Sequence, residues 1–143
     1  MIAHVFIISQ HDWLVKAYFD SEDSDADLIL GELMSVGADM DTMRSAFRNL
    51  RGGMMNTGLT YTSRTHRTTI LVVSRTTSAE EFFNSLVHEM CHAMVHICEV
   101  EGIDLDSEQA SYFMGGLGRD IFPHVKHLLC EHCRESRSCS CGH

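Results

Sequence analysis

The sequence predicts an α+β fold, in which a small antiparallel or mixed sheet packs against one long helix that further helices follow. Three observations predict it. Runs of β-branched and aromatic residues at 2–8, 13–19, 57–63 and 67–74 are typical of strands. Apolar residues recur with helical spacing between the second and third runs and again after the fourth. The length of 143 residues suits one domain.

The first half contains two strands and then two helices. "HVFIIS" and "WLVKAYF" are apolar runs separated by the polar "QHD". A helix is expected from Ser24 to Gly37, a residue suited to a left-handed C-cap, and Asp39 is expected to cap a second helix that ends at "RGG".

The second half begins with two more strands. "TGLTYTS" and "RTTILVVS" are joined by "RTH", which indicates a hairpin or adjacent strands, and "TTILVVS" is expected to present an unpaired edge to an extended peptide. The long helix is expected to begin after Ser78 and end near Gly102. A further helix should start around 106–107, and Pro123 predicts a break before a short last helix.

Composition limits the classes of partner. The formal charge of -9 argues against a nucleic-acid partner, and no segment approaches the roughly 18 apolar residues that span a bilayer. The apolar start lacks a basic leader, which favours a cytoplasmic protein. We expect one domain over residues 1–129 and a Cys/His-rich tail over 130–143. An oligomeric state is not indicated.

The stretch "NSLVHEMCHAMVHICEV" in the long helix contains an HExxH motif. His88 and His92 are one helical turn apart, so both imidazoles can reach one ion at roughly 2.0–2.1 Å. In this motif the two histidines bind zinc and the glutamate, here Glu89, is the general base. The helical wheel separates His88, His92 and His96 from the apolar face. The alternative is that the histidines are ordinary surface or hydrogen-bonded residues.

His96 and Glu108 are the next candidates. His96 is eight residues from His88, about 12 Å along a helix, too far for both to bind one ion. It is expected in the second shell or facing substrate, or on the plain surface. A catalytic zinc needs a third ligand, and Glu108 on the next helix is the first candidate, with Asp104 and Asp106 as competitors. Gly115 and Gly116 predict a close helix approach that would bring Glu108 to the metal. Otherwise Glu108 is a solvated carboxylate in the first helical turn.

The block "EEFFNSLVHEMCHAMVHICEVEGIDLDSEQASYFMGG" resembles the core of small zincin metallopeptidases of the gluzincin type, including minigluzincins and the ImmA/IrrE-like group. The resemblance implies a zincin-like fold and zinc-dependent hydrolysis of a peptide or protein substrate. It also implies that His88, His92 and Glu108 bind Zn²⁺ and that Glu89 is the base. Tyr112, His96 or His66 would be candidates to stabilise an oxyanion. The alternatives are a catalytically silent zincin-fold module that binds metal or protein, and a zinc-dependent adaptor that grips a partner through its tail.

The tail "CEHCRESRSCSCGH" contains four thiols: Cys130, Cys133, Cys139 and Cys141. A CxxC pair followed by a CxC pair predicts a possible second metal site, because clustered cysteines in a reducing compartment suit metal better than disulfides. Three interpretations stay open at this point: a small structural zinc knuckle, a flexible thiol-rich end, and a tail thiolate that blocks the catalytic metal.

Overall fold

A computed structural model describes residues 1–51, 58–136 and 141. Its first half contains β1 (Ile2–Ile8), β2 (Trp13–Ser21), α1 (Ala26–Ser35) and α2 (Met40–Arg51). The second half contains β3 (Gly58–Ser63), β4 (Thr68–Ser74), α3 (Ala79–Glu101), α4 (Glu108–Val125) and α5 (Glu131–Ser136), and short 3₁₀ turns join several of these elements. The predicted strands and the first two helices are therefore present, with shifts of a few residues at their ends.

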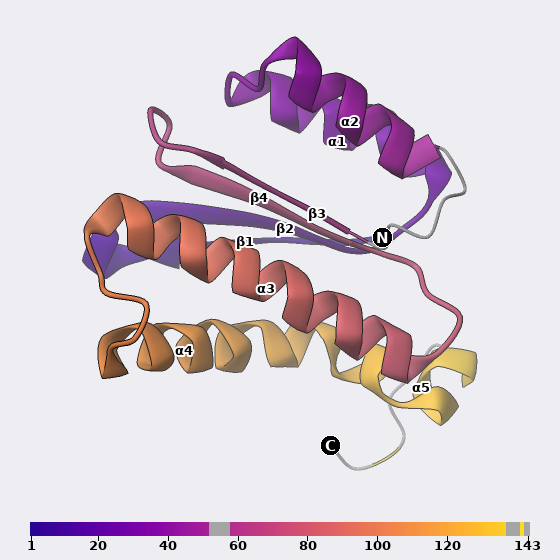
Figure 1. Cartoon of the computed structure of the whole chain (residues 1–143). Helices are drawn as coiled ribbons and strands as arrows, with labels where there is room; N and C mark the ends of the chain where they lie inside the picture. The colour runs from indigo at the N-terminus through magenta and orange to yellow at the C-terminus, as the bar shows by residue number, and fades with distance from the viewer. Residues whose placement is uncertain (52–57, 137–140, 142–143) are drawn as a thin grey trace.

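The four strands form one mixed sheet in the order β1-β2-β4-β3. β1 pairs antiparallel with β2, β2 pairs parallel with β4, and β4 pairs antiparallel with β3. The parallel pair requires a crossover, and α1 and α2 supply it on one face of the sheet (Figure 1). This arrangement confirms the α+β class and the mixed sheet.

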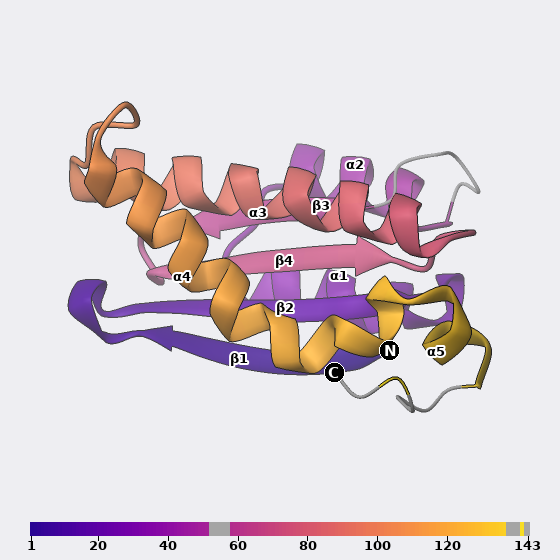
Figure 2. The same cartoon turned by 90° about the horizontal axis from the view of Figure 1, so that it is seen from below.

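Helices cover both faces of the sheet (Figure 1). α1 and α2 lie on one face, while α3 and α4 lie on the other. Viewed from below, α3 runs along β3 and β4, and α4 crosses the side of β2 and β1 (Figure 2). The sheet is therefore the middle of three layers, and α3 lies over the strand that forms one edge.

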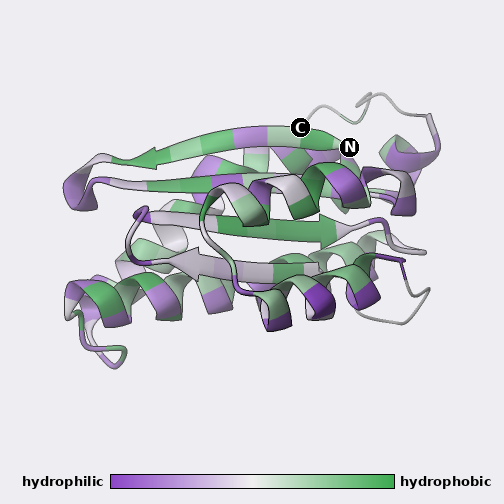
Figure 3. Cartoon of the chain, turned by 90° about the horizontal axis from the view of Figure 1, so that it is seen from above, coloured by the Kyte–Doolittle hydropathy of each residue, from purple (hydrophilic) through white to green (hydrophobic). Residues whose placement is uncertain are grey.

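β4 is the central strand of the hydrophobic core. Ile70 and Val72 pack with the α1 and α2 side, whereas Leu71 and Val73 pack with the α3 side, as the two-residue period of a strand requires. Figure 3 shows the contrast between the strongly hydrophobic β4 and the paler β3 beside it. The expectation that "TTILVVS" forms an open edge is therefore wrong, because a strand buried on both faces lies inside the sheet. The edge next to α3 is β3.

The ends of α3 follow the sequence signals. The Ser78 hydroxyl accepts a hydrogen bond from the Glu81 amide at 3.1 Å, and Gly102 forms the C-cap with a φ of 69°. α4 differs from expectation, because it continues through Pro123 to Val125. Proline lacks a backbone donor and its ring crowds the carbonyl four residues earlier, so packing of the surrounding helix must offset this cost. Within the described residues, no helix combines the length and apolarity needed to cross a membrane.

A histidine pair joins β1 to α4. The rings of His4 and His124 stack with centroids 3.8 Å apart. Burial, and then the neighbouring His4, lower the pKa of His124 below its ordinary value of 6.5. The folded protein therefore favours neutral His124, and this contribution to stability is complete above about pH 6.5 and is lost as the pH falls below it.

We therefore expect His124→Gln to reduce the acid sensitivity of folding. Urea midpoints measured on either side of a pH of about 6.5 should differ less in this variant than in the wild type. Equal differences in the two proteins would show that His124 does not contribute to the pH dependence.

Candidate metal centres

His88 and His92 lie on the exposed side of α3 and their side chains converge. The Nε2 atoms are 3.1 Å apart, and the ring centroids are 4.7 Å apart. Two nitrogen ligands of one tetrahedral zinc ion, each at about 2.05 Å, are separated by about 3.3 Å. The pair therefore has nearly the spacing that a shared ion needs. In the absence of an ion, the same atoms can share one hydrogen as an ordinary hydrogen bond.

Glu89 turns away from solvent toward β3. Only 7% of its surface is exposed, and its Oε2 accepts a hydrogen bond of 2.6 Å from the Thr60 hydroxyl. A Cβ atom at Gly58 would lie 2.6 Å from the Glu89 Cγ, so only glycine permits this approach. β3 therefore fixes the Glu89 carboxylate on the side of α3 that packs against the sheet.

β3 also holds His96. The hydrogen bond to its ring is the last in a series that begins at Trp13. Trp13 Nε1 donates to the Thr69 hydroxyl at 3.0 Å, and Thr69 lies 3.0 Å from the Thr62 hydroxyl. The Thr62 hydroxyl is in turn 3.1 Å from His96 Nδ1. Because an indole can only donate, the most economical direction is Trp13 to Thr69 to Thr62 to Nδ1, which assigns the hydrogen of neutral His96 to Nε2.

The surroundings of His96 favour its neutral form. Burial, and then the neighbouring His92, lower the pKa of His96, although Glu99 and Glu89 act in the opposite direction. The ring lines a cavity of about 240 Å³ together with residues of β3 and the end of α3, namely Thr60, Tyr61, Thr62, Arg64, Glu99 and Val100. His96 therefore lies on the same side of α3 as Glu89, with its imidazole directed by β3.

Thr60 and Thr62 are site residues that the sequence analysis missed. They are two positions apart on β3, so both face α3, where each contacts one polar residue. Their alternation in "LTYTS" was a visible signal, but their partners are about 30 residues away in the sequence. Only the packing of β3 on α3 reveals that they orient Glu89 and His96.

The structure does not bring Glu108 to the histidine pair. α4 packs against the other flank of α3, where Ala110 clusters with Cys98, and a Cβ at Gly118 would lie 3.3 Å from Met90. This antiparallel pairing places Glu108 level with about residue 100, eight residues and about 12 Å beyond His92. In the described part of the chain, no group of potential metal ligands contains both histidines and a third ligand.

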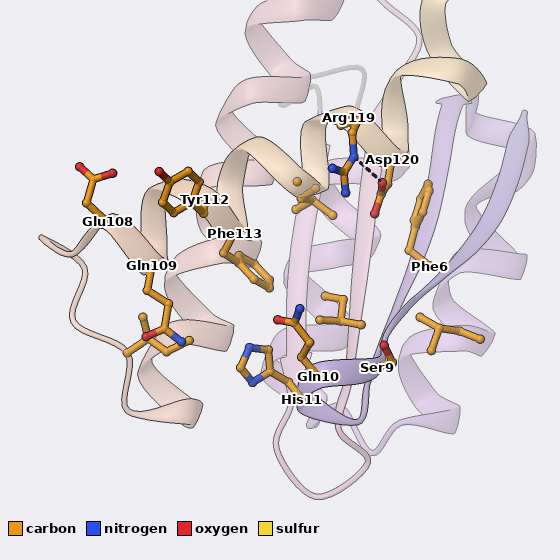
Figure 4. Close-up of a pocket in the computed structure, with 15 residues that line it drawn as sticks. Phe6, Ser9, Gln10, His11, Glu108, Gln109, Tyr112, Phe113, Arg119 and Asp120 are labelled. Atoms are coloured by element: carbon orange, nitrogen blue, oxygen red, sulfur yellow. Dashed lines mark hydrogen bonds and ion pairs between the residues drawn. The ribbon is translucent and has the colours of Figure 1, made fainter.

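Glu108 and Tyr112 instead line a separate cavity of about 620 Å³ between α4 and the β1–β2 turn. In Figure 4 the Glu108 carboxylate points outward, away from His11 and Phe113. Tyr112 is 76% exposed and comes from the same face of α4. The expected close approach at Gly115 and Gly116 is wrong, since a Cβ at either position would meet nothing within 4 Å.

The remaining sequence candidates lie elsewhere. Asp104 and Asp106 belong to the turn after α3, where the Asp106 amide donates to Asp104 Oδ1 at 3.1 Å. His66 follows β3 in a turn, 3.0 Å from the Ser63 hydroxyl, and its ring lies against Gly37 of the α1 layer. His66 is therefore separated by the sheet from the site on α3 that contains His88, Glu89 and His92, called the α3 site below.

The tail thiols form the second cluster. Cys130, Cys133 and Cys141 each place a sulfur within 4.8 Å of the other two, so they could hold a metal ion. Cys139, the fourth predicted thiol, lies outside the described residues. Among the described residues, the Cys141 sulfur lies 3.3 Å from that of Cys133 and 3.7 Å from that of Cys130.

Comparison of the chain with protein-family models, with curated proteins and with solved structures gives no significant match.

Proposed function

We propose that the protein is a zinc-dependent peptidase of the zincin type, and that the α3 site hydrolyses peptide bonds. The observation that carries this proposal is the 3.1 Å separation of the His88 and His92 Nε2 atoms, with the carboxylate of Glu89, the next residue after His88, held by Thr60. His88 and His92 would hold the ion. A zinc ion supplies a Lewis acid that polarises a carbonyl and lowers the pKa of an attacking water.

Glu89 is proposed as the general base and then the general acid. Its carboxylate accepts the proton of the attacking water and passes it to the amine that leaves. The Thr60 hydroxyl holds one oxygen of this carboxylate, so the side chain does not have to search for its orientation. Gly58 keeps the backbone of β3 close to the same carboxylate.

His96 is proposed to face the substrate. With Nδ1 bonded to Thr62, its Nε2–H is the remaining donor, suited to the oxygen of a peptide carbonyl in the cavity beside β3. β3 is the edge strand of the sheet on the side of α3, so an extended peptide could pair with its backbone. This edge replaces β4 as the proposed docking strand.

One observation favours the alternative of a silent zincin-fold module that binds metal or protein without catalysis. Among the described residues, no third ligand converges on His88 and His92. A catalytic zinc ordinarily has three protein ligands, so a two-histidine site would bind the ion more weakly.

The test is hydrolysis of a quenched fluorescent peptide library before and after zinc removal. We expect a strong chelator to stop turnover and zinc readdition to restore it, because Glu89 alone cannot activate an amide at a useful rate. Cleavage that persists after full zinc removal would reject the metallopeptidase proposal. Stoichiometric zinc on α3 with no cleavage of any library member would favour the silent module.

A further inference from the structure

The three described tail thiols already have the spacing of metal ligands. Cys133 Sγ lies 3.3 Å from Cys141 Sγ, which lies 3.7 Å from Cys130 Sγ. Sulfur ligands at about 2.3 Å from a tetrahedral zinc are separated by about 3.8 Å. The sulfurs are much farther apart than the roughly 2.05 Å of a disulfide bond. Their positions therefore suit a shared ion.

His132 supplies a nitrogen next to one of these sulfurs, that of Cys141. Its Nδ1 is 3.5 Å from Cys141 Sγ, close to the roughly 3.6 Å expected between a sulfur and a nitrogen ligand of one zinc ion. Cys133 is fully buried behind the cluster, whereas Cys141 and His132 are exposed in front of it. The exposed imidazole can turn toward the ion without displacing core side chains.

We propose that Cys130, Cys133, Cys141 and His132 bind a structural zinc ion that fastens α5 to the start of α3. Three thiolates and one imidazole select a soft or borderline ion over magnesium or calcium. Four protein ligands leave no open coordination position, which is the arrangement of structural and not catalytic zinc. Its ligands are separate from His88 and His92, so this proposal does not rest on the proposed peptidase activity.

The contacts of α5 indicate the structural role of this zinc ion. α5 lies beside the first turn of α3 (Figure 1), where the Glu131 carboxylate accepts a hydrogen bond from the Ala79 amide. Arg134 Nη2 donates to the Thr76 carbonyl at 2.6 Å. Glu131 and Arg134, which make these two contacts, each follow directly after a cysteine of the cluster. An ion bound to Cys130 and Cys133 would therefore fix the part of the chain that makes both contacts.

α5 needs such help because it is short. It spans Glu131–Ser136, and a helix of so few residues is not stable through its own backbone hydrogen bonds. Metal binding can supply the missing free energy, as it does in small zinc-folded motifs. The tail site would thereby hold the first turn of the helix that carries His88 and His92.

The test uses the full chain, purified with reductant, loaded with zinc or with cobalt alone. Cys141→Ser changes an exposed residue and is the main variant, and Cys133→Ser is the buried companion. Each should bind about one zinc ion per chain less than wild type and lose most of the sulfur-to-cobalt charge-transfer absorption. Cys91→Ser, a change of an exposed thiol outside the cluster, should keep both signals.

His132→Asn tests the fourth ligand. We expect it to retain the charge-transfer absorption but to lose zinc to a chelator at least about 10-fold faster. The matched control is His127→Asn in the preceding turn, which should behave as wild type. Equal chelation rates for the two variants would remove His132 from the ligand set.

Amide hydrogen exchange tests whether the tail zinc holds α5 against the start of α3. The Ala79 amide and its neighbours should exchange faster in Cys141→Ser, and in wild type after zinc removal, than in zinc-loaded wild type. His92→Ala should leave this exchange unchanged while removing any zinc on α3, so failure of the peptidase proposal has a different signature. Unchanged zinc content in Cys141→Ser and Cys133→Ser, or a metal-free Cys133–Cys141 disulfide in the reduced preparation, would overturn the proposal.

Discussion

Replacing Glu89 by glutamine is expected to lower peptide hydrolysis by about 10²–10⁴-fold while zinc on α3 is retained. Glutamine has nearly the same shape, and its amide oxygen can still accept the Thr60 hydroxyl bond that Glu89 Oε2 accepts at 2.6 Å. It cannot take a proton from water. The variant therefore separates the proton transfer from the geometry that positions it.

The measurement pairs library cleavage rates with zinc content by elemental analysis. Glu89 is almost fully buried, and a neutral amide is less costly to bury than a carboxylate, so the urea midpoint should not fall. Glu80→Gln, in the exposed first turn of the same helix, is the matched control and should hydrolyse at the wild-type rate. Full turnover in Glu89→Gln would reject the general-base role.

His92→Ala is expected to lower the zinc affinity of α3 by more than about 100-fold and to remove hydrolysis with it. Only His88 would then remain of the converging pair, and one imidazole does not hold zinc against competing chelators. His92 is exposed, so its removal leaves no core cavity and should change the free energy of unfolding little. Competition with a zinc-sensitive dye, in a Cys141→Ser background that lacks the tail thiol, measures the α3 site alone.

Glu108→Ala is the informative comparison for the same titration. If Glu108 is the third ligand, as the motif resemblance implies, this variant should bind zinc more weakly than wild type. The packing of α4 instead predicts that its zinc affinity is unchanged. An unchanged affinity would place the third ligand elsewhere. Wild-type zinc binding in His92→Ala would show that the HExxH histidines are surface residues.

The long helix and its chemistry were accessible from the sequence because they are local. Ser78 and Gly102 mark the ends of α3 through bonds within a turn, and the step of four residues from His88 to His92 sets their separation without any partner. The tail thiols were accessible for the same reason, since CxxC is a typical spacing of two zinc ligands that lie close in sequence.

Relations between elements were not accessible. The continuous apolar run of β4 favours a strand buried on both faces, but which strands flank it, and that β3 is the edge next to α3, became known only from the strand order. Gly115 and Gly116 were predicted to lie at the close approach of two helices, but the residue of α4 that lies against Met90 of α3 is Gly118. A shift of three residues along α4 changes which side chains meet α3, and no local signal fixes it.

By itself, the sequence determined the α+β class, the order of the elements, and an exposed histidine pair beside a glutamate on one helix. These follow from hydrophobic period, capping and spacing, which are properties of neighbouring residues. Only the tertiary structure decided that β3 places Thr60 and Thr62 against Glu89 and His96, and that Glu108 lies on the far flank of α3. The physical reason is that contacts between distant segments depend on which apolar faces pack together, and that choice is made by the whole core at once.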